Sequence, residues 1–137
     1  MRAAFKTYSC SQENAYVIKL TLRNLVTGDE TTLEAVIDTG FDGYVMLTRE
    51  NYAKLQLSLT EAPEEQFPFY RTLAGTVVFR KSIAQLTLAE KTFITEVITP
   101  KHGNGKNLIG KRTLQHFTTI IHKNQMTCMG EADLENG

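Results

Sequence analysis

Hydrophobic and polar residues alternate along most of the chain. This two-residue period is typical of β-strands that bury one face. The clearest example runs from position 16 to 23, where every second residue is apolar. The pattern predicts further strands over residues 32–37, 82–88 and 93–99, an extended segment over 67–70 that resumes at 77–79, and a closing hairpin from 118–121 and 125–129 with its turn at 122–124. The sequence therefore predicts a mainly β domain.

Two short helices interrupt this pattern. Thr48 is suited to cap the first helix, because a threonine side chain accepts a hydrogen bond from the backbone of the first turn, where Glu50 also lies. We expect this helix to continue to Leu55. The second helix is indicated by Leu114 and Phe117, which are three residues apart, as one helical face requires.

The segment with the clearest chemistry is Val36-Ile37-Asp38-Thr39-Gly40. The apolar residues before Asp38 indicate a buried strand that ends at this carboxylate, and Gly40 lets the chain reverse where a side chain would clash. The Thr39 hydroxyl is placed to stabilise the turn. An ordinary solvated turn is the alternative. Such turns seldom lie between two strongly β-forming runs, and residues 44–47 are apolar again, so we interpret Asp38 as a functional carboxylate.

These residues resemble the hydrophobic-hydrophobic-Asp-Thr-Gly motif at the active site of the retropepsin-like aspartic proteases. A second segment, Leu108-Ile109-Gly110-Lys111-Arg112, is similar to the strand and short helix near the C-terminal end of that domain. The resemblance implies a mainly β fold, a closed β-barrel with one or two short helices, in which the two motifs cross in a ψ-shaped active-site sheet. Viral members usually carry Arg after the glycine. Here Lys111 follows and then Arg112, so the cation that pairs with Asp42 is left open.

The same resemblance implies an aspartic endopeptidase, a hydrolase in which two neighbouring carboxylates share a proton. The chain carries the motif once, since none of Asp29, Asp42 and Asp133 is followed by Thr-Gly or Ser-Gly. The second carboxylate must then come from an identical chain. We therefore expect a C2 homodimer whose two Asp38 side chains meet at the axis, with a protein or peptide as substrate.

The resemblance also implies roles for residues around the carboxylate. In the family, the threonine of the motif interlocks across the dimer axis and the glycine carbonyl contacts the substrate, which assigns supporting roles to Thr39 and Gly40. We expect Asp42, two residues beyond Gly40, to support the active site as well. A flexible hairpin covers the substrate. The best candidate is residues 71–77, with Gly75 at the tip and four substrate-binding positions, Leu73, Ala74, Gly75 and Thr76. An ordinary β-hairpin is the alternative for this segment.

Length and charge narrow the remaining possibilities. The 137 residues make one domain, with a core over about 16–130 and a polar tail at 131–137. The 15 basic and 15 acidic residues balance, which argues against a nucleic-acid or membrane-surface partner. No apolar run is long enough for a membrane span. Cys10 and Cys128 favour a reduced, cytoplasmic setting, and a bridge between them is the alternative.

We expect no cofactor and no metal. His102, His116 and His122 lack the spacing of metal ligands, and residues 103–106 lack the upstream glycine and the hydroxyl residue of a phosphate loop. Two other functions stay open. One is a non-catalytic dimerisation or peptide-binding module on the same fold. The other is an unrelated small β-barrel that binds a partner through a sheet edge, with an accidental Asp-Thr-Gly match.

Overall fold

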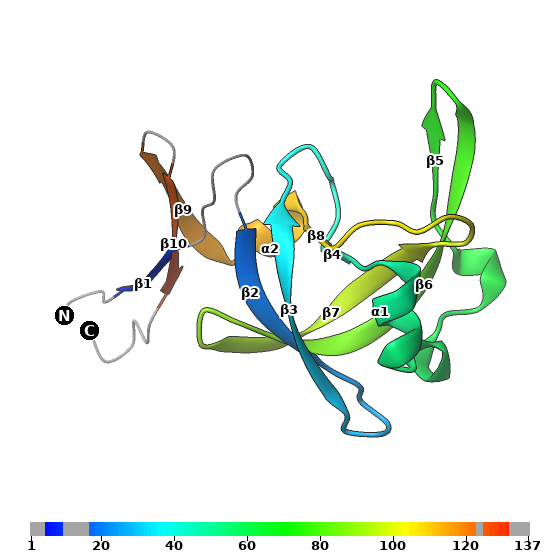
Figure 1. Ribbon diagram of the computed structural model, residues 1–137, viewed down its shortest axis with the longest axis horizontal. Coiled ribbons are helices and arrows are strands. Elements are labelled where there is room, and N and C mark those ends of the chain that lie inside the picture. Colours follow the sequence, from blue (N-terminus) through cyan, green and yellow to red (C-terminus); the bar gives the residue numbers. More distant parts are fainter. Residues whose placement is uncertain (1–4, 10–16, 123–124, 132–137) are drawn as a thin grey trace.

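The computed structural model describes residues 5–9, 17–122 and 125–131, which form mainly β-strands (Figure 1). In chain order the strands are β1 (Phe5–Ser9), β2 (Val17–Arg23), β3 (Glu30–Ile37), β4 (Val45–Met46), β5 (Phe69–Thr72), β6 (Gly75–Leu88), β7 (Lys91–Pro100), β8 (Leu108–Ile109), β9 (Phe117–His122) and β10 (Gln125–Glu131). The helical elements in this part of the chain are α1 (Arg49–Lys54), α2 (Lys111–Leu114) and the 3-10 helices η1 (Leu57–Thr60) and η2 (Glu64–Gln66). The predicted mainly β fold with short helices is confirmed.

Six of the described strands close into a ring. Their order is β2-β3-β8-β4-β7-β6, and β2 pairs again with β6. Strand β5 extends the sheet beyond β6 and forms with it a hairpin that projects from the ring (Figure 1). A separate three-stranded sheet has the order β1-β10-β9. The ring places β8, from late in the chain, between β3 and β4, and this crossing positions the candidate site.

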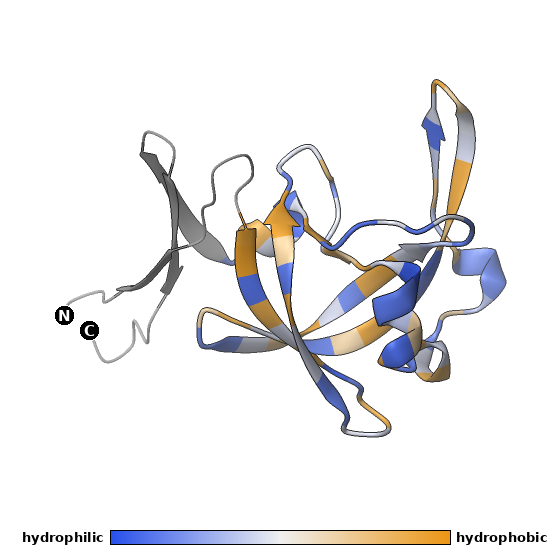
Figure 2. Ribbon diagram, in the orientation of Figure 1, coloured by the Kyte–Doolittle hydropathy of each residue, from blue (hydrophilic) through white to orange (hydrophobic). Residues whose placement is uncertain are grey.

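The inside of the ring is filled by side chains that alternate along the strands. In β2, Ile18, Leu20 and Leu22 are buried, as their spacing predicts, and Figure 2 shows the alternation of apolar and polar residues along this strand. The first helix and η1 cover the core with the buried residues Tyr52 and Leu57. The predicted cap of α1 is confirmed, since the Thr48 hydroxyl accepts a hydrogen bond of 3.2 Å from the Asn51 backbone.

One predicted strand boundary is wrong. The sequence predicts separate segments over residues 77–79 and 82–88, but both belong to one strand. Strand β6 runs without interruption for 14 residues and pairs with β7 from Phe79 to Leu88. The expected break coincides with a change of the buried face, because Phe79 is buried on one side of the strand and Ser82, three residues later, on the other. At this point Arg80 pairs with Glu61, so a charged residue is accommodated within the strand.

The predicted second helix is also shorter than its spacing indicated. Helix α2 ends at Leu114, and Phe117 is the first residue of β9, opposite Gly130. The β-branched run Thr118-Thr119-Ile120-Ile121 explains this difference, because such residues favour a strand over a helix. The three-residue spacing of Leu114 and Phe117 therefore does not reflect a shared helical face.

The remaining expectations concern the ends of the chain. The closing hairpin is confirmed as the antiparallel pair β9–β10, whereas β1, which pairs with β10, was not predicted. Positions 123–124 of the predicted turn, Cys10 and residues 132–137 of the expected tail lie outside the described residues. Among the helices that are described, none is long and apolar enough to cross a membrane.

Candidate active site

Asp38 lies directly after the last residue of β3, where the strand meets β8. Ile37 is opposite Ile109 in this parallel pair, and the Asp38 backbone N–H donates to the Ile109 carbonyl at 2.9 Å. The Asp38 side chain is half-buried, and its Oδ1 accepts a hydrogen bond of 3.0 Å from the Gly40 backbone. Thr39 and Gly40 are exposed. The core strand thus fixes the depth of the carboxylate, and the next two residues lie at the surface.

The two motifs of the sequence meet in one crossing. Strand β8 lies between β3 and β4, parallel to β3 and antiparallel to β4, which is the ψ-shaped arrangement that the family resemblance implies. Beyond the strand, three backbone N–H groups of the second motif donate to the loop after Asp38: Gly110 to Tyr44 at 2.8 Å, Lys111 to Phe41 at 2.8 Å and Arg112 to Gly43 at 3.0 Å. The loop that follows the carboxylate is therefore held by main-chain hydrogen bonds.

Close packing explains the glycine in the second motif. A Cβ on Gly110 would lie only 2.3 Å from the Gly43 carbonyl oxygen and 2.7 Å from the Phe41 ring. A Cβ on Gly43 would lie 2.5 Å from the same ring. The Phe41 ring therefore occupies space that two absent side chains leave, and any larger residue at position 110 forces the two loops apart.

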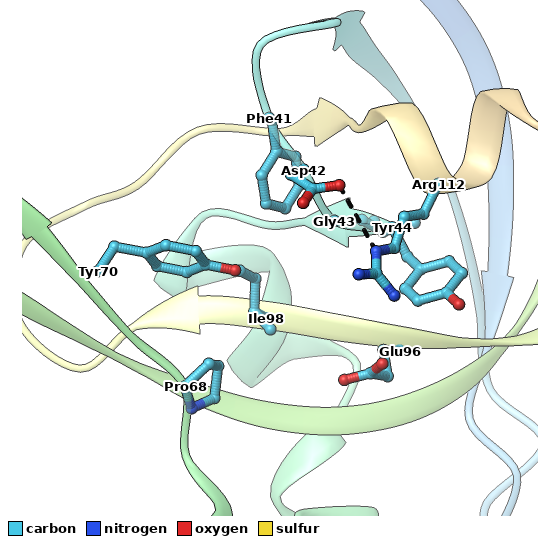
Figure 3. A pocket seen from close by; sticks show the side chains of 10 residues that line it. Phe41, Asp42, Gly43, Tyr44, Pro68, Tyr70, Glu96, Ile98 and Arg112 are labelled. Carbon is cyan, nitrogen blue, oxygen red and sulfur yellow. Dashed lines mark ion pairs between the residues drawn. The ribbon is translucent and has the colours of Figure 1, made fainter.

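Arg112 is the cation that pairs with Asp42, which resolves the choice that the sequence left open. Its Nε lies 3.6 Å from Asp42 Oδ1, and its guanidinium is 6.0 Å from the centre of the Tyr44 ring (Figure 3). The Tyr44 side chain and then the Asp42 carboxylate raise the pKa of Arg112 above its ordinary value. Both partners of the ion pair are more than half exposed, so it contributes little to stability.

The predicted flap segment forms the β5–β6 hairpin. Its two-residue turn is Leu73-Ala74, so the tip lies directly before Gly75, which is the first residue of β6. Gly75 has a φ of +119°, a conformation that other residues rarely adopt. Leu73 is fully exposed, and Thr76 is also exposed. The hairpin therefore presents an apolar side chain to solvent at its tip.

A pocket of about 160 Å³ lies between the loop after Asp38 and the base of the hairpin. A single water needs only about 10–15 Å³ of such space, so the pocket has room for a side chain. Figure 3 shows its walls, which come from the loop (residues 41–45), the hairpin base (Pro68, Tyr70), β7 (Glu96, Ile98) and α2 (Arg112). The sequence contains no signal for Glu96 and Ile98, because they lie within an ordinary alternating strand.

The described residues contain no group of three or more His, Cys, Asp or Glu side chains that suits a metal ion. The arrangement thus offers a half-buried carboxylate in an exposed turn. The loop that follows this turn lines a pocket with aromatic and charged walls.

Comparison with solved structures identifies the architecture. A retropepsin-like aspartic protease from Rickettsia conorii superposes with a TM-score of 0.67 and 16% sequence identity, covering 97% of this chain and 98% of that one. The chain has a retropepsin-like fold. EIAV protease, in a complex with the inhibitor HBY-793, superposes with a TM-score of 0.57 and 17% identity, covering 75% of this chain and 88% of that one. No family model matches the sequence, and no curated protein matches it.

Proposed function

We propose that this chain is an aspartic endopeptidase that acts as a C2 homodimer, with one Asp38 from each chain at a shared active site. The observation that carries the proposal is the position of Asp38 on the ψ-shaped crossing of a retropepsin-like fold. Two solved structures that share this fold are described as proteases. The single Asp-Thr-Gly motif supports the dimer, because the chemistry needs two carboxylates.

Catalysis then follows from two carboxylates that face each other across the axis. Two such groups held close together do not both ionise easily, so they share one proton. The ionised Asp38 takes a proton from a water held between them, and this water attacks the carbonyl carbon of the peptide bond. The protonated Asp38 hydrogen-bonds to the carbonyl oxygen, and a proton passes to the leaving nitrogen as the C–N bond breaks.

The residues next to Asp38 have supporting roles in this proposal. Thr39 and Gly40 are exposed beside the carboxylate, which leaves them accessible to a second copy of the chain and to a substrate. The β5–β6 hairpin closes over an extended peptide, with residues 73–76 contacting the substrate. The hydrogen bond from Gly40 to Asp38 Oδ1 orients the carboxylate before the substrate binds. A cytoplasmic location remains part of the proposal.

The decisive experiment compares Asp38→Asn with Asp29→Asn, which changes an exposed aspartate in the turn between β2 and β3. Wild type and Asp29→Asn should cleave an unfolded protein, and Asp38→Asn should retain its fold and sedimentation as a dimer but lose cleavage. A wild-type dimer that cleaves nothing from acidic to neutral pH would instead favour the non-catalytic module. A wild type that stays monomeric at tens of micromolar would contradict the proposed active site.

A further inference from the structure

The pocket beside the loop after Asp38 has walls of opposite charge. Arg112 and Glu96 both line it, and although both belong to the described part of the chain, no ion pair joins them. In Figure 3 the Arg112 guanidinium and the Glu96 carboxylate both lie at the pocket, and they come from different elements, α2 and β7. The pocket therefore offers hydrogen-bond donors on one wall and acceptors on another.

Each of these charged groups already has a partner of opposite sign. Arg112 Nε lies 3.6 Å from Asp42, and Glu96 Oε1 lies 3.7 Å from Lys81 on β6. Asp42, Glu96 and Arg112 line the pocket, and their formal charges cancel only together with Lys81, which does not line it. An incoming lysine would gain Glu96 but approach Arg112, and an incoming glutamate would gain Arg112 but approach Glu96 and Asp42. A charged side chain of either sign thus meets repulsion as well as attraction.

A carboxamide fits both walls without this conflict. Glutamine and asparagine have an oxygen that accepts from a guanidinium and an NH₂ group that donates to a carboxylate, and they carry no net charge. The aromatic and aliphatic part of the lining, from Phe41, Tyr70 and Ile98, suits the apolar stem of such a side chain. Ile98 is buried within β7, which pairs with β4 and β6 at this residue.

We propose that this pocket selects a glutamine or asparagine side chain of the peptide substrate, with Arg112 and Glu96 as the residues that determine the specificity. This inference rests on the proposed function for its choice of a peptide as the ligand. Tyr70 belongs to the hairpin as well as to the pocket, so occupation of the pocket links substrate recognition to the position of the hairpin.

The test uses two readouts. Products of wild-type cleavage of a mixed peptide library, identified by mass spectrometry, give the preference at each substrate position. Fluorescence anisotropy then measures how extended peptides with glutamine, glutamate, lysine or norleucine at the selective position bind to the Asp38→Asn variant. Glutamine should bind about tenfold more tightly than norleucine, because hydrogen bonds to charged groups supply that difference.

Two variants should move the preference in opposite directions. In the Asp38→Asn background, Glu96→Gln leaves an excess of positive charge and should favour glutamate, whereas Arg112→Gln leaves an excess of negative charge and should favour lysine. The matched controls are Lys111→Gln, an exposed cation next to Arg112, and Glu65→Gln, an exposed carboxylate. Neither control residue lines the pocket, so both variants should keep the wild-type preference.

The outcomes separate the two proposals. Wild-type cleavage that prefers norleucine or a charged residue overturns the pocket assignment and leaves the protease proposal intact. The same holds if the binding preference shifts equally in the Glu96→Gln and Arg112→Gln variants. Binding with the charge-dependent pattern but without wild-type cleavage supports the pocket assignment and overturns the protease proposal. If wild type neither binds nor cleaves any peptide, both proposals fall.

Discussion

Replacing Gly110 with alanine tests whether the crossing of the two motifs depends on close backbone packing. Gly110 has φ −93° and ψ 175°, which alanine adopts without strain, so any cost must come from the added methyl group. That methyl carbon would lie 2.3 Å from the Gly43 carbonyl oxygen and 2.8 Å from the Gly43 carbonyl carbon. Ordinary contacts between such atoms are more than about 3 Å, so the Gly43 backbone must move by roughly 1 Å.

That movement is costly because the Gly43 carbonyl already accepts the Arg112 backbone N–H at 3.0 Å. Forcing an extra methyl group into a packed region costs about 1–3 kcal/mol, and a lost hydrogen bond adds about 1 kcal/mol. We therefore expect Gly110→Ala to lower the free energy of unfolding by about 2–4 kcal/mol. For a domain of this size, this corresponds to a decrease in Tm of roughly 6–15 °C.

Urea denaturation followed by circular dichroism measures this loss directly. The comparison variant is Gly103→Ala, because a Cβ there meets no atom within 4 Å and only the φ of +89° makes the substitution costly. That conformational cost is about 1–2 kcal/mol. If Gly110→Ala unfolds at the same urea concentration as wild type, the crossing is not packed as described and the steric reasoning is refuted.

Three further variants test other parts of the structure. Asn24→Ala should lower the free energy of unfolding, measured by urea denaturation, by about 2–4 kcal/mol, because the buried Asn24 side chain makes four hydrogen bonds to the backbone. The control Asn104→Ala changes an exposed loop residue and should leave the stability nearly unchanged. Burial and then the Glu61 carboxylate raise the pKa of Tyr52. The protonated phenol therefore stabilises the fold fully at pH values below its ordinary pKa of 10.0, and this contribution decreases as the pH rises above 10. The stability difference between wild type and Tyr52→Phe should therefore shrink above pH 10 in urea titrations, and a constant difference would contradict this origin. Leu73→Ser should leave the stability unchanged, since the side chain is fully exposed, but weaken peptide binding if the hairpin closes over the substrate.

The sequence predicts the strands and helices of this fold better than it predicts which residues these elements place close to one another. Local patterns are sufficient to predict the buried face of β2 and the Thr48 cap, because both depend on residues that are close in the sequence. The length of β6 was missed because the face that it buries changes between Phe79 and Ser82, and such a change depends on what packs against each end. Glu96 was missed for a similar reason, since only the paired strands place it near the loop after Asp38.

The contacts that hold this loop also explain why the sequence alone does not indicate whether Lys111 or Arg112 pairs with Asp42. Main-chain hydrogen bonds from residues 110–112 and the absence of a side chain at Gly110 fix the loop, whereas the ion pair between Arg112 and Asp42 is long and exposed. An exposed ion pair supplies little of the energy that orders a loop. The loop can therefore keep its shape whether the cation follows the glycine directly or one residue later. Gly110, by contrast, cannot be replaced by a larger residue without moving the loop, because the Gly43 backbone occupies the space where its Cβ would lie.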